Sequence, residues 1–192
     1  MPWQSKKPRR KLEPLTEPAL YDYAVAALGR RMRTVAELKR LMHARVESGE
    51  PGEHKIDAVL QRLEKYGYID DAAFAAVYTR LRQENEGFGK LRVKRDLARK
   101  GIARDLIGST VDAAYENTSE EETARHYLAR KRISKPQNQK EIARVARRLF
   151  AAGFSASTLS KILKNWEVEC SDEDLAAYQE AEVEGKTKNG SD

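Results

Sequence analysis

Residues 93–102 read VKRDLARKGI, and residues 145–154 read VARRLFAAGF. The two stretches align without a gap at an offset of 52 residues. Apolar positions match apolar positions, and a glycine suited to ending a helix recurs as Gly101 and Gly153. A repeat of this period is typical of small helical units that stack along one axis. We therefore expect function on a surface that the units share, rather than in a single cleft.

Helical periodicity extends to both sides of this repeat. Apolar residues recur at the i, i+3, i+4 and i+7 spacing of an amphipathic helix, and we find no alternating strand pattern of useful length. The sequence predicts an all-α protein with five parts: a flexible basic arm (1–16), three tandem three-helix repeats (17–69, 70–117 and 118–166) and a flexible acidic tail (167–192).

Each predicted repeat is too small to be very stable alone, so the repeats are expected to stack into an elongated, curved body. The alternative is three independent bundles joined by flexible linkers. The connections at 67–71 and 117–119 are short, which favours rigid stacking.

The net charge of +6 conceals an asymmetry along the chain. Residues 167–192 hold nine acidic residues against two lysines, so residues 1–166 carry a net charge of +13. A body this basic attracts polyanions such as nucleic acid. The acidic tail is open to three interpretations: it screens the body, it contacts a basic partner, or it only adds solubility.

The composition points to a cytoplasmic protein without a membrane anchor, and a modular, elongated array of repeats needs no second copy, so we expect a monomer. No apolar run approaches the roughly 18 residues that a bilayer crossing needs. The N-terminus lacks the apolar segment of a signal peptide. Cys170 is the single cysteine, so no intrachain disulfide can form.

The repeated helix carries a row of arginines. At about 100° per residue, Val93 and Leu97 share one side of the helix, and Arg92, Arg95 and Arg99 share another. The matched face is basic in the other repeats as well, with Arg148 at the position of Asp96. The predicted contact residues are Lys39, Arg40, Lys90, Arg92, Lys94, Arg95, Arg99, Lys100, Arg144, Arg147 and Arg148.

Any one of these side chains is explained equally well as a good helix former on a solvated surface. The threefold recurrence at matched positions favours a function. Arginine suits phosphate and carboxylate alike, because its planar fork donates two parallel hydrogen bonds. We expect binding that is weakly sequence-specific and strongly salt-dependent.

Catalytic and metal-binding patterns are missing from the sequence. His43, His54 and His126 lack the spacing of a helical metal site, and no phosphate-binding Gly-x-x-x-x-Gly-Lys-Ser/Thr loop occurs. Asp70 and Asp71 lie at a predicted helix start, where they are most simply caps. We expect no enzyme activity, no metal and no cofactor.

One region resembles a known family. It runs over residues 67–102 and reads Gly67-Tyr68-Ile69-Asp70-Asp71, Phe74-Ala75, Tyr78, Arg80 and Arg82, then Gly87-x-Gly89-Lys90-x-Arg92-Val93, Leu97 and Lys100-Gly101-Ile102. This pattern resembles the central signature of the RecX family of bacterial recombination regulators. Leu91 departs from it, because the family often has proline there.

The resemblance implies a non-enzymatic modulator of RecA. Members are similar in being helical tandem repeats that lodge in the groove of the RecA filament on single-stranded DNA and suppress its ATPase, strand-exchange and coprotease activities. The expected partners are therefore the RecA filament and, weakly, single-stranded DNA. The expected mechanism is wedging between protomers or blocking of filament extension.

The alternative is a stand-alone DNA-binding protein, such as a repressor that uses one repeat as a helix-turn-helix. The basic residues are spread over all repeats, and no single recognition helix is evident. Both features count against this alternative.

Overall fold

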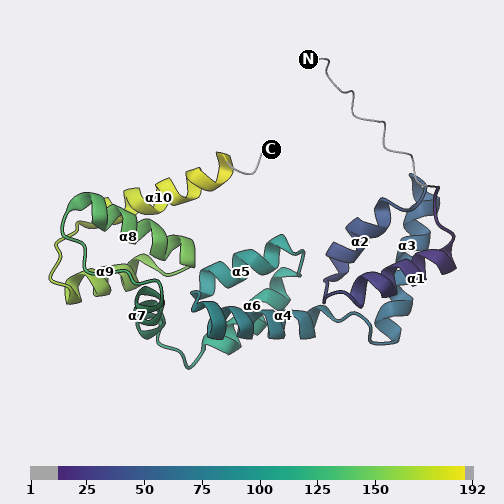
Figure 1. The fold of residues 1–192 in the computed structure, drawn as a ribbon, viewed down its shortest axis with the longest axis horizontal. Helices are drawn as coiled ribbons and strands as arrows, with labels where there is room; N and C mark the ends of the chain where they lie inside the picture. Colours follow the sequence, from purple (N-terminus) through teal and green to yellow (C-terminus); the bar gives the residue numbers. More distant parts are fainter. Residues whose placement is uncertain (1–12, 189–192) are drawn as a thin grey trace, which may run out of the picture. The chain divides into compact units, whose positions relative to one another are not determined.

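The computed structural model describes residues 13–188, and every regular element within that range is helical (Figure 1). This agrees with the predicted all-α class. The chain divides into two compact units, the first ending at Asp71 and the second beginning at Ala72.

The first unit holds helices α1 (Glu17–Leu28), α2 (Val35–His43) and α3 (Glu50–Lys65). Their apolar stripes form one core, in which the fully buried side chains are Leu20, Ala24, Leu38, Met42, Ile56 and Leu63. The body begins slightly earlier than predicted, because Leu15 packs against this core and donates its backbone N–H to Arg45 O at 2.7 Å. The rest of the predicted basic arm, residues 1–12, lies outside the described residues.

Asp71 acts as a cap, but for a distant helix. Its Oδ1 accepts the backbone N–H of Val35, the first residue of α2, at 2.9 Å. Thr34 caps the same end by accepting the N–H of Glu37 at 3.1 Å. Burial raises the pKa of Asp71, and the negative charges of Asp70 and Glu37 add to that effect against the hydrogen bond from Val35. The sequence predicts a cap for the helix that begins at Asp70 and Asp71, whereas this bond caps α2, 36 positions away in the chain.

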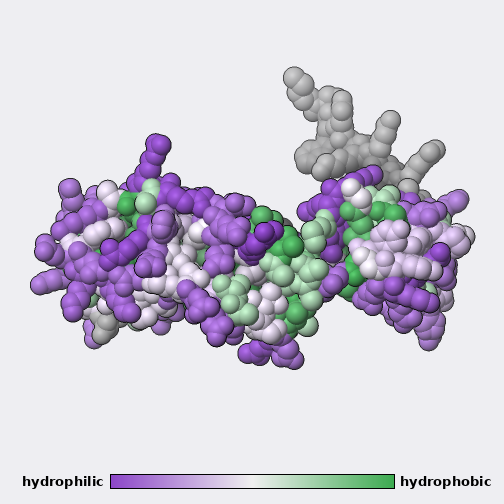
Figure 2. Space-filling model, turned by 90° about the horizontal axis from the view of Figure 1, so that it is seen from below, coloured by the Kyte–Doolittle hydropathy of each residue, from purple (hydrophilic) through white to green (hydrophobic). Residues whose placement is uncertain are grey.

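The second unit begins with α4, which runs into a π-helical turn. Its first set of elements is α4 (Asp71–Leu81), η1 (Arg82–Glu86), α5 (Lys90–Arg99) and α6 (Arg104–Tyr115). Their core includes Phe74, Ala75, Val93, Leu97 and Val111. On the face that Figure 2 shows, the α4–α6 region is the more apolar part of this unit.

The second set is α7 (Glu120–Arg130), α8 (Gln139–Ala152) and α9 (Ala156–Asn165). Side chains of Ser119, Asn138 and Ser155 cap their N-termini. Helix α8 ends at Gly153, whose φ of +91° lies in the left-handed region, as the repeat of the glycine predicts.

The acidic segment differs from the flexible tail that its composition predicts. Residues Asp172–Lys188 form helix α10, which packs on α8 and α9. Leu175 is only 4% exposed and belongs to the core of the second set, with Tyr178 packed beside it. Two apolar residues in an acid-rich segment were too weak a sequence signal to predict this contact.

Candidate functional site

Two arginines of the basic helix α5 pair with an aspartate of the same helix, Asp96. The Asp96 carboxylate is nearly buried, and both of its oxygens lie 3.0 Å from Nε of Arg92. Arg99 donates a further hydrogen bond to Oδ1 from its guanidinium. Burial pushes the pKa of Asp96 up, but the hydrogen bonds from Arg99 and Arg92 outweigh it, and the pKa falls below its ordinary value. Two of the three arginines in the predicted row therefore share an internal counter-ion.

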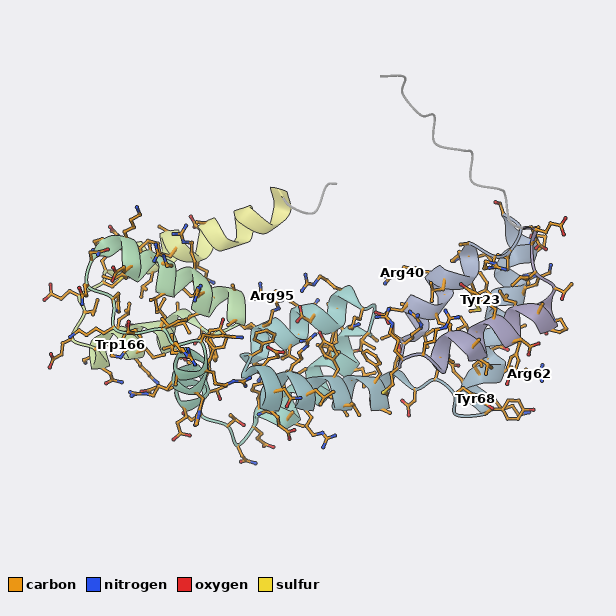
Figure 3. The ribbon with its side chains drawn as sticks, in the orientation of Figure 1. Tyr23, Arg40, Arg62, Tyr68, Arg95 and Trp166 are labelled. Carbon is orange, nitrogen blue, oxygen red and sulfur yellow. The ribbon has the colours of Figure 1, made fainter. Side chains whose placement is uncertain are left out.

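The same helix also binds the end of α8. Arg92 donates from Nη1 to Ala151 O at 3.0 Å, and Arg95 donates from Nη2 to Phe150 O at 3.1 Å. The last carbonyls of a helix lack partners within the helix and carry a partial negative charge. The two guanidinium groups therefore cap α8 from another helix, and Figure 3 labels Arg95 where α5 meets the end of α8.

The backbones of α5 and α8 are hydrogen-bonded to each other as well. Gly89 N–H donates to Ala152 O at 2.8 Å, and Leu91 N–H donates to Gly153 O at 3.3 Å. The unpaired N–H groups at the start of α5 thus meet the unpaired carbonyls at the end of α8 (Figure 1). We call this end-to-end contact, formed by residues 89–95 and 150–153, the α8–α5 joint.

Glycines make the α8–α5 joint possible. A β-carbon on Gly153 would lie 2.2 Å from Arg92 N, and one on Gly89 would lie 2.4 Å from Gly153 O. Phe88, between Gly87 and Gly89, packs on the cores of both sets of helices. The Tyr115 hydroxyl donates to Phe88 O at 2.7 Å, and burial raises the pKa of Tyr115 to about 12. The Gly-Phe-Gly turn is therefore part of the joint between two helical repeats.

The lysines around α5 are also engaged. Lys90 and Lys94 lie 2.8 and 2.6 Å from Oδ1 of Asp112, and their hydrogen bonds lower the pKa of Asp112. The Lys100 ammonium lies 5.2 Å from the centre of the Phe74 ring, within the range of a cation–π contact. All six basic residues predicted as contacts in this repeat have internal partners.

Helix α8 presents its arginines differently. Arg144, Arg147 and Arg148 are exposed. Among the described residues, Arg147 donates only to Ala143 O of its own helix, at 3.1 Å, and the side chains of Arg144 and Arg148 form no hydrogen bond or ion pair. The difference comes from one matched position, because Arg148 occupies the place that Asp96 has in α5. Among the side chains that the structure describes, this cationic row has no acidic partner.

Comparison with known proteins identifies the family. The profile for the second three-helix domain of RecX matches residues 70–110. Regulatory protein RecX of Leptothrix cholodnii is 32% identical over 146 residues, which cover 76% of this chain and 88% of that relative. The chain belongs to the RecX family.

A second relative and a solved structure show how much of the chain is similar to RecX proteins. RecX of Mycolicibacterium vanbaalenii is 35% identical over 122 residues, so that the chain spans 64% of that relative's length. The crystal structure of RecX from Lactobacillus salivarius superimposes with a TM-score of 0.61 over 79% of this chain and 96% of that one, at 19% identity. The structural likeness shows that the fold is that of RecX.

The RecX profile covers α5 and its Asp96, whereas α8 lies outside the matched residues. The predicted contact residues in the first unit divide in the same way. Lys39 lies 3.2 Å from both Glu53 and Asp57, and hydrogen bonds to Asp57 and Glu53 raise the pKa of Lys39. Arg40, aligned with Asp96 and Arg148, is exposed and has no partner among the described residues (Figure 3).

Sequence reasoning missed the internal role of the α5 arginines, although a signal was present. Asp96 lies four residues after Arg92 and three before Arg99, which is the spacing of ion pairs on a helix. Among residues 13–188 no cluster of three or more metal-ligating side chains occurs, and no helix has the length and apolar composition to cross a bilayer.

Proposed function

We propose that this RecX-family chain regulates recombination and repair by binding the RecA filament on single-stranded DNA and inhibiting its ATPase, strand-exchange and coprotease activities. It acts as a monomer, by binding and without catalysis of its own. It lodges in the filament groove or caps the growing end. Family membership and the basic surface of α8 support this proposal.

The observation that carries the proposal is the contrast in counter-ions. Arg144, Arg147 and Arg148 are exposed without an acidic partner among the described residues, so they have donors to offer to phosphate or to carboxylates of the filament. Arg92 and Arg99 already share Asp96. The contact surface therefore centres on α8, with Arg40 as a further exposed arginine, and α5 has a structural role.

The test is RecA-dependent ATP hydrolysis on single-stranded DNA with increasing amounts of the full chain. The variant replaces Arg144, Arg147 and Arg148 with glutamine. Its matched control replaces three exposed basic residues elsewhere in the second unit, Arg80, Arg104 and Lys161, and so removes the same charge. We expect the wild type and the control to inhibit well below a one-to-one ratio and the α8 variant to need at least tenfold more protein.

Equal weakening by both variants would show that only overall charge matters, and inhibition undiminished in the α8 variant would remove α8 from the interface. No inhibition by the wild type at any ratio would overturn the assignment to RecA. A salt titration on random single-stranded, duplex and RecA-coated DNA tests the helix-turn-helix alternative, which requires sharp preference for one duplex sequence.

A further inference from the structure

Two tyrosines at the end of α3 are unusually exposed. Tyr66 is 60% exposed and Tyr68 is 52% exposed, and they lie on either side of Gly67. Figure 3 shows the Tyr68 ring projecting away from the ribbon. Large aromatic side chains are usually at least partly buried, because burying such a ring removes much apolar area from water. Their exposure calls for an explanation.

The tyrosines are held outward by an ordered turn. Gly67 has a φ of +69°, its N–H donates to Glu64 O at 2.9 Å, and the N–H of Tyr68 donates to Leu63 O at 2.9 Å. The next residue, Ile69, is 5% exposed and belongs to the core of the first unit. The turn is therefore anchored on both sides. A backbone that is already ordered loses little conformational entropy when a ligand binds.

Two cations lie close in sequence to the two tyrosines. Arg62 and Lys65, in the last turn of α3, are both exposed. The Arg62 guanidinium lies 4.1 Å from the centre of the Tyr21 ring, and that cation–π contact holds it in place. Basic residues also suit a helix C-terminus. That local effect accounts for the charges but not for the exposed rings.

We propose that Tyr66, Tyr68, Arg62 and Lys65 form a binding patch for single-stranded nucleic acid, with the tyrosines stacking on bases and the cations contacting phosphates. Exposed aromatic rings beside cations are the two components that sequence-independent single-strand binding needs. Duplex DNA does not fit, because its bases are already stacked on one another. The inference rests on the proposed function only for the presence of single-stranded DNA, and it requires no contact with RecA.

The experiment measures fluorescence anisotropy of a labelled oligothymidylate and of an abasic strand of equal length and charge, without RecA. For the full chain we expect base-bearing DNA to bind roughly tenfold tighter than abasic DNA, given the usual contribution of one stacked base. The double variant Tyr66→Ala/Tyr68→Ala should lose that preference and retain its affinity for the abasic strand. Tyr66→Phe/Tyr68→Phe should behave as the wild type, because the rings remain.

Two controls keep the result specific. Met32→Ala removes another exposed apolar side chain of the first unit and should change neither affinity. Arg62→Gln/Lys65→Gln should weaken both strands alike and lower the salt dependence of binding. Equal loss on both strands in the tyrosine-to-alanine variant, or no loss on either, would overturn the proposal. The same variant can also be measured on RecA-coated DNA. If it binds RecA-coated DNA more weakly than the wild type but binds free DNA equally well, the patch contacts protein and the proposal is overturned.

Discussion

Helices α5 and α8 carry the same repeated sequence and use it in opposite ways. In α5 the arginines converge on Asp96 and on the last carbonyls of α8. In α8 the matched arginines are exposed, and Arg148 replaces the aspartate. One carboxylate therefore separates a row of arginines that holds the fold from a row that is available to a partner. A charge pattern repeated in sequence does not imply a function repeated in space.

A substitution in the α8–α5 joint should have the largest effect on the stability of the protein. In Gly153→Ala, a side chain at φ +91° would meet the backbone of Arg92 at 2.2 Å. We expect the free energy of unfolding to fall by about 3 kcal/mol, from left-handed strain and displacement of α5 together. Gly67→Ala is the control, because Gly67 also has a positive φ but has nothing within 4 Å of its β-carbon. It should lose only about 1 kcal/mol.

Urea unfolding followed by circular dichroism gives both values. Equal losses in the two variants would show that the close approach of α8 and α5 contributes nothing beyond local strain.

Asp96→Ala tests the counter-ion of α5. It removes a nearly buried carboxylate and leaves Arg92, whose side chain is 29% exposed, without its main partner. We expect a loss of about 2 kcal/mol in the free energy of unfolding, which is less than the ~3–5 kcal/mol for breaking a fully buried pair, because Arg99 is mostly solvated. Asp112→Ala also breaks two close ion pairs, but its side chain is 51% exposed. It should leave thermal unfolding unchanged, and a matching loss there would contradict the role of burial.

The pH dependence of stability follows from the same carboxylate. The pKa of folded Asp96 lies below its ordinary value, so its ionised form stabilises the fold above the unfolded pKa, about 4. That contribution is lost as the pH falls through the folded pKa. The difference in unfolding free energy between the wild type and Asp96→Asn should therefore shrink on acidification.

Asp71 supplies the opposite case. Its pKa is raised, so its stabilising contribution is complete below the unfolded pKa and is lost as the pH rises through the folded pKa. Asp71→Asn should gain stability relative to the wild type over that rise. Unfolding titrations at a series of pH values measure both differences, and a change of the same sign in both would refute the assignment.

Arg148→Asp makes α8 resemble α5 and has the smallest expected effect on stability. Arg144 lies four residues earlier, so one exposed helical pair forms, and the free energy of unfolding should change by less than about 0.5 kcal/mol. Inhibition of RecA should nevertheless weaken, because one exposed cation is replaced by an anion. Thermal unfolding and the ATPase assay are measured together. Unchanged inhibition would show that this position faces no partner.

Much of the fold follows from local sequence signals. Apolar spacing predicts the helices, Ser119 opens α7 and Gly153 ends α8 as expected. The α8–α5 joint could not be predicted, because its hydrogen bonds link side chains to carbonyls 55 and 59 residues away, and any arginine can make such a bond. Helix α10 was missed because Leu175 and Tyr178 are the large side chains that pack on the core in a segment otherwise rich in acidic residues and alanines. The elongated, curved shape of the whole chain stays a prediction.

The α8–α5 joint has a mechanical consequence. Two helix ends that share backbone hydrogen bonds and two guanidinium caps cannot bend apart without breaking several bonds at once. A force that displaces α8 therefore also acts on α5, because the two helix ends are bonded to each other. A partner bound to α8 is therefore coupled to α5 through this joint, whose close approach depends on Gly89 and Gly153.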